Sequence, residues 1–263
     1  MSNQKINITG KRILLVGSTG VLGRVYASEL AKIDNIQLVI ADTNQTDVLL
    51  YAEELGVLGV EIDVAFEASV IACLKYVKSQ LGGLDSVINN AAATGESLIN
   101  SGEAFANFED YPLTVWKKTI DINLTGIFLV AREAGRLIKA TSKQGSLINI
   151  SSIYGVVGPD HRIYEGQLFK SFPGYSASKS GVIGLTKWLA TWWGGSIRVN
   201  CVTPGGVFNK HNDEFVEAYS NRVPMGRMAN REELFGIILY LLSDSSSYTT
   251  GQNFIIDGGY TAW

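Results

Sequence analysis

A glycine-rich turn between two apolar runs is the feature that most constrains the fold of this chain. The first run, 11–16, is short and almost entirely apolar, as in a parallel strand that is buried on both faces. Gly17, Gly20 and Gly23 follow it, and an amphipathic helical pattern over 24–33 comes next. At such a turn the backbone N–H groups and the helix dipole hold a pyrophosphate, and glycines leave room for its approach. The sequence therefore predicts a dinucleotide-binding unit.

An acidic residue follows at the spacing that NAD-binding proteins use. The second apolar run, 36–41, ends in Asp42, nineteen residues after Gly23. A carboxylate there accepts hydrogen bonds from the ribose 2′-hydroxyl, although aspartate also commonly ends a strand at a turn. We expect NAD(H) to be preferred. Arg24 leaves NADP(H) open, because an arginine near the adenosine end can instead bind a 2′-phosphate.

The alternation of strands and helices continues without a proline-rich or serine-rich linker. The next elements are expected as helix 45–55, strand 57–62, helix 66–81 and strand 84–89. This order predicts a single α/β domain over 1–263, a Rossmann-type doubly wound parallel sheet with helices on both faces. Ligands then bind at the carboxyl ends of the strands, where Asp63 and Val64 and the run Asn90, Ala91 and Ala92 fall.

Composition excludes several classes of partner. The net charge is −3 and no basic cluster is present, so we expect no nucleic-acid partner. The two cysteines, Cys73 and Cys201, fall in helix and strand patterns without zinc-ligand spacing, so no metal site is expected. The N-terminus lacks an apolar signal segment and no run of about eighteen apolar residues exists, which predicts a cytoplasmic protein without a membrane span.

Tyr175 and Lys179 are the first candidates for chemistry. They lie four positions apart at the start of a helical pattern, so both side chains project from one face. A fixed positive charge lowers the pKa of a nearby phenol, which would let Tyr175 act as a general acid and base. An ordinary solvent-exposed helix face is the alternative. Asn123, inside the helical pattern 113–139, is disfavoured there and indicates a kink or a bound water.

Together these motifs resemble the short-chain dehydrogenase/reductase family over nearly the whole chain. The shared motifs are the glycine-rich turn, Asn89-Asn90-Ala91-Ala92, Asn123, the strand 146–151 followed by Ser152, Tyr175 with Lys179, Pro204-Gly205, and the ending Gly251 to Gly259. The resemblance implies a single-domain NAD(P)-dependent oxidoreductase acting on CH–OH groups.

The resemblance also implies roles for individual residues. Tyr175 would donate or accept the proton, Lys179 would assist it and hold the nicotinamide ribose, Ser152 would bind the substrate oxygen, and Asn123 would hold a water. The residues implied to bind the cofactor are Gly17, Thr19, Gly20, Val21, Leu22, Gly23, Asp42, Asp63, Val64, Asn90, Ala91, Ala92, Tyr175, Lys179, Pro204, Gly205 and Val207.

Three features depart from the family pattern. The spacing of Gly17, Gly20 and Gly23 is that of the larger branch that includes sugar-nucleotide epimerases and dehydratases, and Asn209 stands where threonine is usual. The segment 153–174 is longer than usual and polar, so we expect it to act as a substrate loop, beside a small helical cap at about 206–228. A solvated surface loop is the alternative.

The substrate and the assembly are the remaining expectations. The substrate-binding candidates are Ser152, Tyr154, His161, Arg162 and Tyr175. The amino-acid sequence of the loop is similar to that of short-chain dehydrogenases of flagellin modification and legionaminic-type sugar biosynthesis. This resemblance implies that the substrate is a polar, sugar-derived small molecule. A non-catalytic NAD-sensing regulator is a second hypothesis. A homodimer or homotetramer is expected, with Tyr260 and Trp263 exposed at the interface.

Overall fold

The computed structural model describes residues 6–94 and 105–263, and these form a seven-stranded parallel sheet between two layers of helices. The strand order is β3-β2-β1-β4-β5-β6-β7. The strands are β1 (Arg12–Val16), β2 (Gln37–Asp42), β3 (Leu58–Glu61), β4 (Ser86–Asn89), β5 (Gly145–Ile150), β6 (Ile197–Pro204) and β7 (Asn253–Ile256). The chain reverses its direction of winding between β1 and β4, which confirms the doubly wound Rossmann-type sheet.

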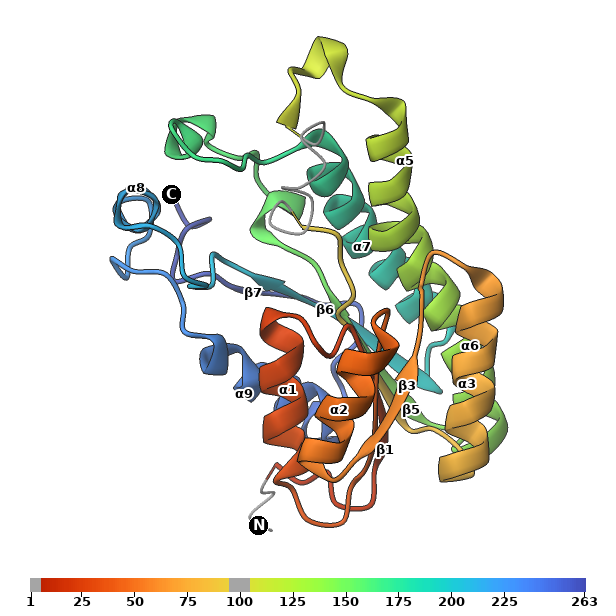
Figure 1. Cartoon of the computed structure of the whole chain (residues 1–263). Helices are drawn as coiled ribbons and strands as arrows, with labels where there is room; N and C mark the ends of the chain where they lie inside the picture. Colours follow the sequence, from red (N-terminus) through yellow and green to blue (C-terminus); the bar gives the residue numbers. More distant parts are fainter. Residues whose placement is uncertain (1–5, 95–104) are drawn as a thin grey trace.

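Helices cover both faces of the sheet (Figure 1). The helices are α1 (Val21–Ala31), α2 (Gln45–Leu55), α3 (Glu67–Leu81), α5 (Leu113–Ile120), α6 (Gly126–Thr141), α7 (Pro173–Trp192), α8 (Asp213–Ser220) and α9 (Phe235–Leu242). Side chains of α3, α6 and α7 pack on the face with Leu14 and Val16, and those of α1, α2 and α9 on the face with Ile13 and Leu15. Successive residues of β1 thus point to opposite cores, as its nearly all-apolar sequence predicts.

The long helix expected over 113–139 is divided into two. The helix α5 ends at Ile120, a π-helical turn occupies Asp121–Thr125, and α6 begins at Gly126. Asn123 lies within this turn and is fully buried. The sequence indicated a kink or a bound water at Asn123, and the irregularity that the structure has there is this π-helical turn.

The aromatic residues near the C-terminus do not behave alike. Trp263 is 80% exposed, as expected, but the expectation for Tyr260 is wrong, because its side chain is only 6% exposed. Its ring stacks on Tyr219 of α8 at 5.2 Å and belongs to a small separate core. A pattern of apolar and polar residues does not reveal this contact, since it joins two segments that are distant in the sequence.

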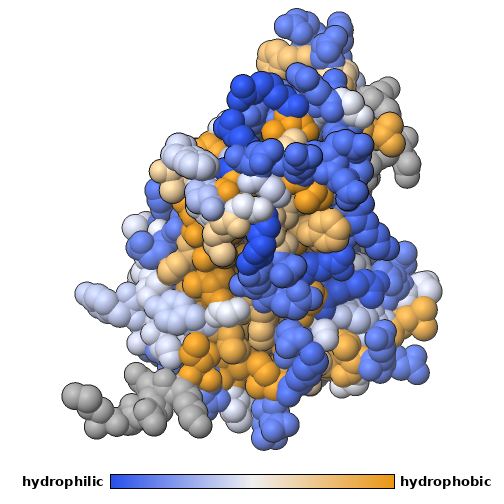
Figure 2. Space-filling view, turned by 90° about the vertical axis from the view of Figure 1, so that its left-hand side faces the viewer, coloured by the Kyte–Doolittle hydropathy of each residue, from blue (hydrophilic) through white to orange (hydrophobic). Residues whose placement is uncertain are grey.

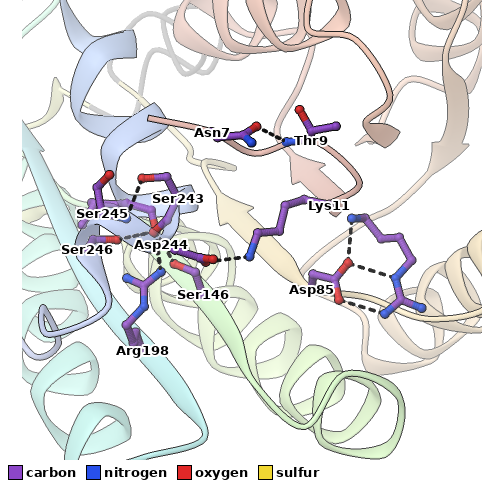
Figure 3. A network of polar contacts seen from close by, with 12 residues as sticks. Asn7, Thr9, Lys11, Asp85, Ser146, Arg198, Ser243, Asp244, Ser245 and Ser246 are labelled. Carbon is purple, nitrogen blue, oxygen red and sulfur yellow. Dashed lines mark hydrogen bonds and ion pairs between the residues drawn. The ribbon is translucent and has the colours of Figure 1, made fainter. Parts of the chain in front are cut away.

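Polar contacts close the end of the sheet opposite the glycine-rich turn (Figure 3). Arg12, at the start of β1, makes two side-chain hydrogen bonds to the carboxylate of Asp85, at 3.0 and 2.8 Å. Lys11 pairs with Asp244 at 3.0 Å, and Arg198 donates to the carbonyl of Ser243.

No helix in the described part of the chain has the length and apolar character needed to cross a bilayer.

Replacing Asp85 with Asn is expected to lower the free energy of unfolding at pH 7 by about 1–2 kcal/mol. Burial raises the pKa of Asp85, but hydrogen bonds from Arg12 and Ser142 outweigh it and bring the pKa to about 2 from 3.8. The carboxylate therefore stabilises the fold above pH 4 and loses this contribution as the pH falls toward 2.

Urea unfolding from pH 7 to pH 3 measures this effect, and Asp244→Asn serves as the control. The Asp244 side chain is 83% exposed, so its loss should change the free energy of unfolding by less than about 0.5 kcal/mol. Equal effects of the two substitutions would contradict the assignment.

Candidate active site

A cavity of about 880 Å³ opens at the carboxyl ends of the strands and contains most of the candidate residues. Those that line it are Gly17, Thr19, Gly20, Val21, Leu22, Asp42, Asp63, Val64, Asn90, Ala91, Ala92, Ser152, Tyr154, Tyr175, Lys179, Pro204, Gly205 and Val207. Gly23, Asn123, His161 and Arg162 are not among its lining residues. The site therefore forms where a doubly wound sheet places ligands.

The three glycines of the turn have different tasks. Gly17 has φ +79°, and a Cβ on it would lie 2.5 Å from the backbone nitrogen of Ala91. A Cβ on Gly23 would overlap the carbonyl oxygen of Gly17, so Gly23 allows α1 to pack closely on the turn. At Gly20, the N-cap of α1, the nearest atom to an added Cβ would be 3.8 Å away. The fold does not require glycine there, but a pyrophosphate at the helix N-terminus does, so the turn fits a dinucleotide.

Asp42 and Arg24 occupy different places around this turn. The carboxylate of Asp42 accepts hydrogen bonds from the backbone N–H groups of Thr19 and Thr43, both at 2.8 Å. Arg24 is paired with Asp47 at 2.7 Å, and its guanidinium lies 4.5 Å from the centre of the Tyr51 ring. Asp42 thus lines the cavity, whereas Arg24 is engaged with α2.

Two asparagines hold the backbone around the cavity. The Asn90 amide donates to the carbonyl of Gly17 at 2.7 Å. Asn123 accepts from the N–H of Ala93 at 2.6 Å and donates to its carbonyl at 3.0 Å. Its amide also donates to the hydroxyl of Ser178 at 3.3 Å, which joins the π-helical turn to α7. The side chain of Asn123 therefore fixes the segment after β4.

Tyr175, Lys179 and Ser152 meet in the cavity. Tyr175 and Lys179 lie one turn apart on α7, and the Lys179 ammonium is 5.7 Å from the centre of the Tyr175 ring. Lys179 is buried and donates to the carbonyl of Ile150 at 2.9 Å. Burial lowers the pKa of Lys179 to about 8 from 10.5. At pH 7 it is still mostly protonated, so a cation lies beside the phenol.

Several residues of the site were not among the sequence candidates. Tyr164, Phe169, Phe172 and His211 also line the cavity, as does Asn209, which the sequence marked only as a departure from the family pattern. Tyr164 and Tyr154 share a hydrogen bond of 2.7 Å between their hydroxyls. No motif distinguishes Tyr164, Phe169, Phe172 and His211 in the sequence, because only the tertiary fold brings their two segments together.

His161 and Arg162 lie elsewhere. Both line a second cavity of about 1040 Å³, which shares Tyr164, Lys170, Ser171 and Phe172 with the first. The side chain of Arg162 makes two hydrogen bonds to Asp160, both at 2.8 Å, and is 76% exposed. The segment from Tyr164 to Phe172 therefore separates these two residues from Tyr175.

Comparisons with known proteins agree with this geometry. A family model described as enoyl-(acyl carrier protein) reductase matches residues 19–261. A trans-4-hydroxycyclohexanecarboxylate dehydrogenase of Sinomonas cyclohexanicum is 35% identical over 100% of this chain and 97% of its own length. A 3-alpha-(or 20-beta)-hydroxysteroid dehydrogenase of Mycobacterium tuberculosis (strain CDC 1551 / Oshkosh) is 34% identical over 97% of this chain and 91% of its own.

A solved structure extends the similarity to the cofactor. It is a short-chain dehydrogenase from Leptospira borgpetersenii with bound NAD+, at 31% identity and a TM-score of 0.83. The match covers 96% of this chain and 93% of that one. The glycine-rich turn and the catalytic candidates described above thus lie in a fold that carries NAD+ in a related protein.

Proposed function

This chain belongs to the short-chain dehydrogenase/reductase family and is an NAD(P)-dependent oxidoreductase of CH–OH groups, and we propose that it interconverts an alcohol and a ketone on a small polar substrate with NAD(H). One observation carries the proposal: Ser152, Tyr175 and Lys179 line the same cavity as the glycine-rich turn. A reacting carbon can therefore lie between a bound nicotinamide and a proton-transfer group.

The residues divide the chemistry among them. When bound, the nicotinamide cofactor supplies or accepts the hydride. In the reductive direction the Tyr175 hydroxyl donates its proton to the carbonyl oxygen, and the Ser152 hydroxyl donates a hydrogen bond to the same oxygen. The protonated Lys179 stabilises the phenolate that remains. Asn123 acts through the backbone of Ala93, as a positioning residue.

The proposal is tested by following NADH absorbance at 340 nm with a panel of ketones. The panel contains cyclic ketones, keto acids and keto sugars, and the matching alcohols are assayed with NAD+. Hydride transfer to at least one ketone is the expected result. Binding of NADH without transfer to any ketone or alcohol of the panel would count against the proposed chemistry.

A preference for NAD(H) over NADP(H) is part of the proposal. Asp42 lines the cavity at the carboxyl end of β2, where its carboxylate would repel a 2′-phosphate and accept from a 2′-hydroxyl. Arg24 pairs with Asp47, donates to the carbonyl of Thr19 at 3.0 Å and is not among the lining residues. We expect NADH to bind at least about tenfold more tightly than NADPH. The reason is that repulsion between Asp42 and the 2′-phosphate of NADPH outweighs the attraction of Arg24, whose charge is screened by Asp47.

The variant Asp42→Ser is expected to remove most of this preference. Titrations of NADH and NADPH by protein fluorescence measure both affinities, and Asp34→Ser is the control because Asp34 is exposed and is not a lining residue. If the wild-type protein binds the two cofactors equally, Asp42 does not discriminate between a 2′-hydroxyl and a 2′-phosphate on the ribose.

We also propose that the chain assembles into a homodimer or homotetramer. The edge strand β7 has one partner strand, β6, and Figure 2 shows apolar surface on the side that carries β7 and α9. Trp188 and Trp192 of α7 are stacked at 5.3 Å and are 57% and 69% exposed. Exposed aromatic residues of this kind suit a protein interface.

Light scattering is expected to give two or four times the chain mass of 28.5 kDa. The double variant Trp188→Glu/Trp192→Glu should shift the mass toward the monomer if α7 is an interface, whereas Tyr248→Glu, at a single exposed ring, should not. A wild-type mass of one chain would refute the assembly.

The substrate loop and the cap also belong to the proposal. The segment 153–174 supplies Tyr154, Tyr164 and Phe172 to the cavity, and the region 206–228, which contains α8, supplies His211. Figure 1 shows α8 standing away from the sheet on the same side as this loop, drawn in green. A sugar-derived substrate is supported by the resemblance of the loop sequence alone.

A further inference from the structure

The substrate end of the cavity has walls formed by aromatic rings of two clusters. Tyr164 lies 5.8 Å from Phe169, and His211 lies 6.0 Å from Phe169, as ring-centre distances. Phe172 contacts the catalytic Tyr175 at 5.6 Å. All five of these side chains line the cavity. Flat apolar walls of this kind suit a ring-shaped ligand, whose faces bury more area against them than a narrow chain does.

Two hydroxyls at this end, those of Tyr154 and Tyr164, are already paired, whereas the buried hydroxyl of Ser171 has no partner among the described residues. Tyr154 and Tyr164 bond to each other at 2.7 Å, and burial raises the pKa of both phenols, so they stay neutral. The backbone N–H of Gly206 donates to the hydroxyl of Tyr219 at 2.5 Å, which engages a third phenol nearby. The two paired phenols therefore offer less to a ligand that carries many hydroxyls than unpaired phenols would.

The charges at this end have one sign. Lys170 lies between Phe169 and Ser171, all three of which line the cavity. It has no ion pair among residues 6–94 and 105–263. The acidic lining residues, Asp42 and Asp63, belong to the carboxyl ends of β2 and β3, beside the glycine-rich turn. An anionic group at the substrate end therefore meets an unpaired cation and no lining carboxylate.

We infer that the substrate is a saturated ring that carries the reacting oxygen and a carboxylate, with the ring between the aromatic walls and the carboxylate at Lys170. This inference rests on the proposed alcohol–ketone oxidoreduction, and it specifies the substrate class. An alicyclic keto acid and a uronic acid share this chemistry. The paired phenols favour the alicyclic acid, because it needs fewer hydrogen bonds.

The test compares four ketones in NADH-dependent reduction: 4-oxocyclohexanecarboxylate, its carboxamide, cyclohexanone and the open-chain 4-oxopentanoate. The wild type should have a kcat/KM about tenfold higher for the ring carboxylate than for the carboxamide, mostly through KM, since Lys170 acts by binding. Salt should weaken this preference because the lysine is exposed. Glucuronate is assayed separately with NAD+. Its oxidation would indicate that the substrate is a uronic acid, and the absence of oxidation would favour the alicyclic acid.

Two variants and a control separate charge from shape. Lys170→Met should abolish the preference for the carboxylate by lowering kcat/KM for the carboxylate far more than for the carboxamide. The control is Lys187→Met, at an exposed lysine that does not line the cavity, and it should have no effect. Phe169→Ala should weaken the ring ketones more than 4-oxopentanoate.

The outcomes distinguish this inference from the proposed function. Reduction of cyclohexanone without a preference for the carboxylate, or a Lys170→Met variant that affects all four ketones equally, would overturn the inference alone. Failure to reduce any ketone, and to oxidise any matching alcohol, would overturn the proposed function and the inference with it.

Discussion

Replacing Tyr175 with phenylalanine is expected to lower kcat by about 10³-fold, with little change in the affinity for NADH. The substitution removes only the hydroxyl that transfers the proton, and general acid–base groups contribute factors of this size. The ring itself remains and keeps its contact with Phe172, at 5.6 Å between ring centres, so the cavity wall should persist. Stopped-flow reduction under single-turnover conditions, together with an NADH titration, measures both quantities.

Lys179 should respond differently from Tyr175. Its ammonium is buried beside the Tyr175 ring and donates to the carbonyl of Ile150. In Lys179→Met both the charge beside the phenol and the donor at this carbonyl are lost. The rate constant kcat should fall because the phenolate loses its cation, and cofactor affinity should fall with it because Lys179 is also expected to hold the nicotinamide ribose. Tyr164→Phe is the control for loss of a neighbouring phenol, and it should reduce the rate far less. A Tyr175→Phe variant with near-normal single-turnover rates would show that another group transfers the proton.

The sequence predicted the part of the site that depends on the sheet. Gly17, Asp42, Asn90 and Ser152 follow strands whose order is set by the alternation of strands and helices, so their meeting at one edge could be inferred from the chain alone. Tyr175 and Lys179 meet because helical periodicity places them one turn apart. These are local rules, and in the structure the residues that they concern line one cavity.

The substrate end could not be predicted in this way. His161 and Arg162 stand in the expected loop, yet they line only the second cavity, while Tyr164 of the same 3-10 turn lines both. Which side of the turn faces Tyr175 is decided by packing of Tyr164 on Phe169 and Phe215, the latter from α8. No periodicity relates these segments, so polarity alone gave a polar loop where the fold provides aromatic walls.

The second large effect is expected at the glycine-rich turn, where two neighbouring glycines should respond in opposite ways to alanine. Gly20→Ala should leave the free energy of unfolding within about 0.5 kcal/mol of the wild type, because the nearest atom to its Cβ is 3.8 Å away and the residue already has φ −72°. It should nevertheless weaken NADH binding by at least about tenfold, since the methyl group occupies the approach of the pyrophosphate to the N-terminus of α1.

Gly23→Ala should instead destabilise the fold by about 2–4 kcal/mol, because its Cβ would overlap the carbonyl oxygen of Gly17 and backbone atoms of Ser18, which cannot move as a flexible side chain does. Thermal unfolding without cofactor and calorimetric titration with NADH measure the two effects separately. If Gly20→Ala binds NADH as tightly as the wild type, the pyrophosphate does not approach α1 at this glycine. If Gly23→Ala is as stable as the wild type, glycine at this position is not needed for close packing of α1 on the turn.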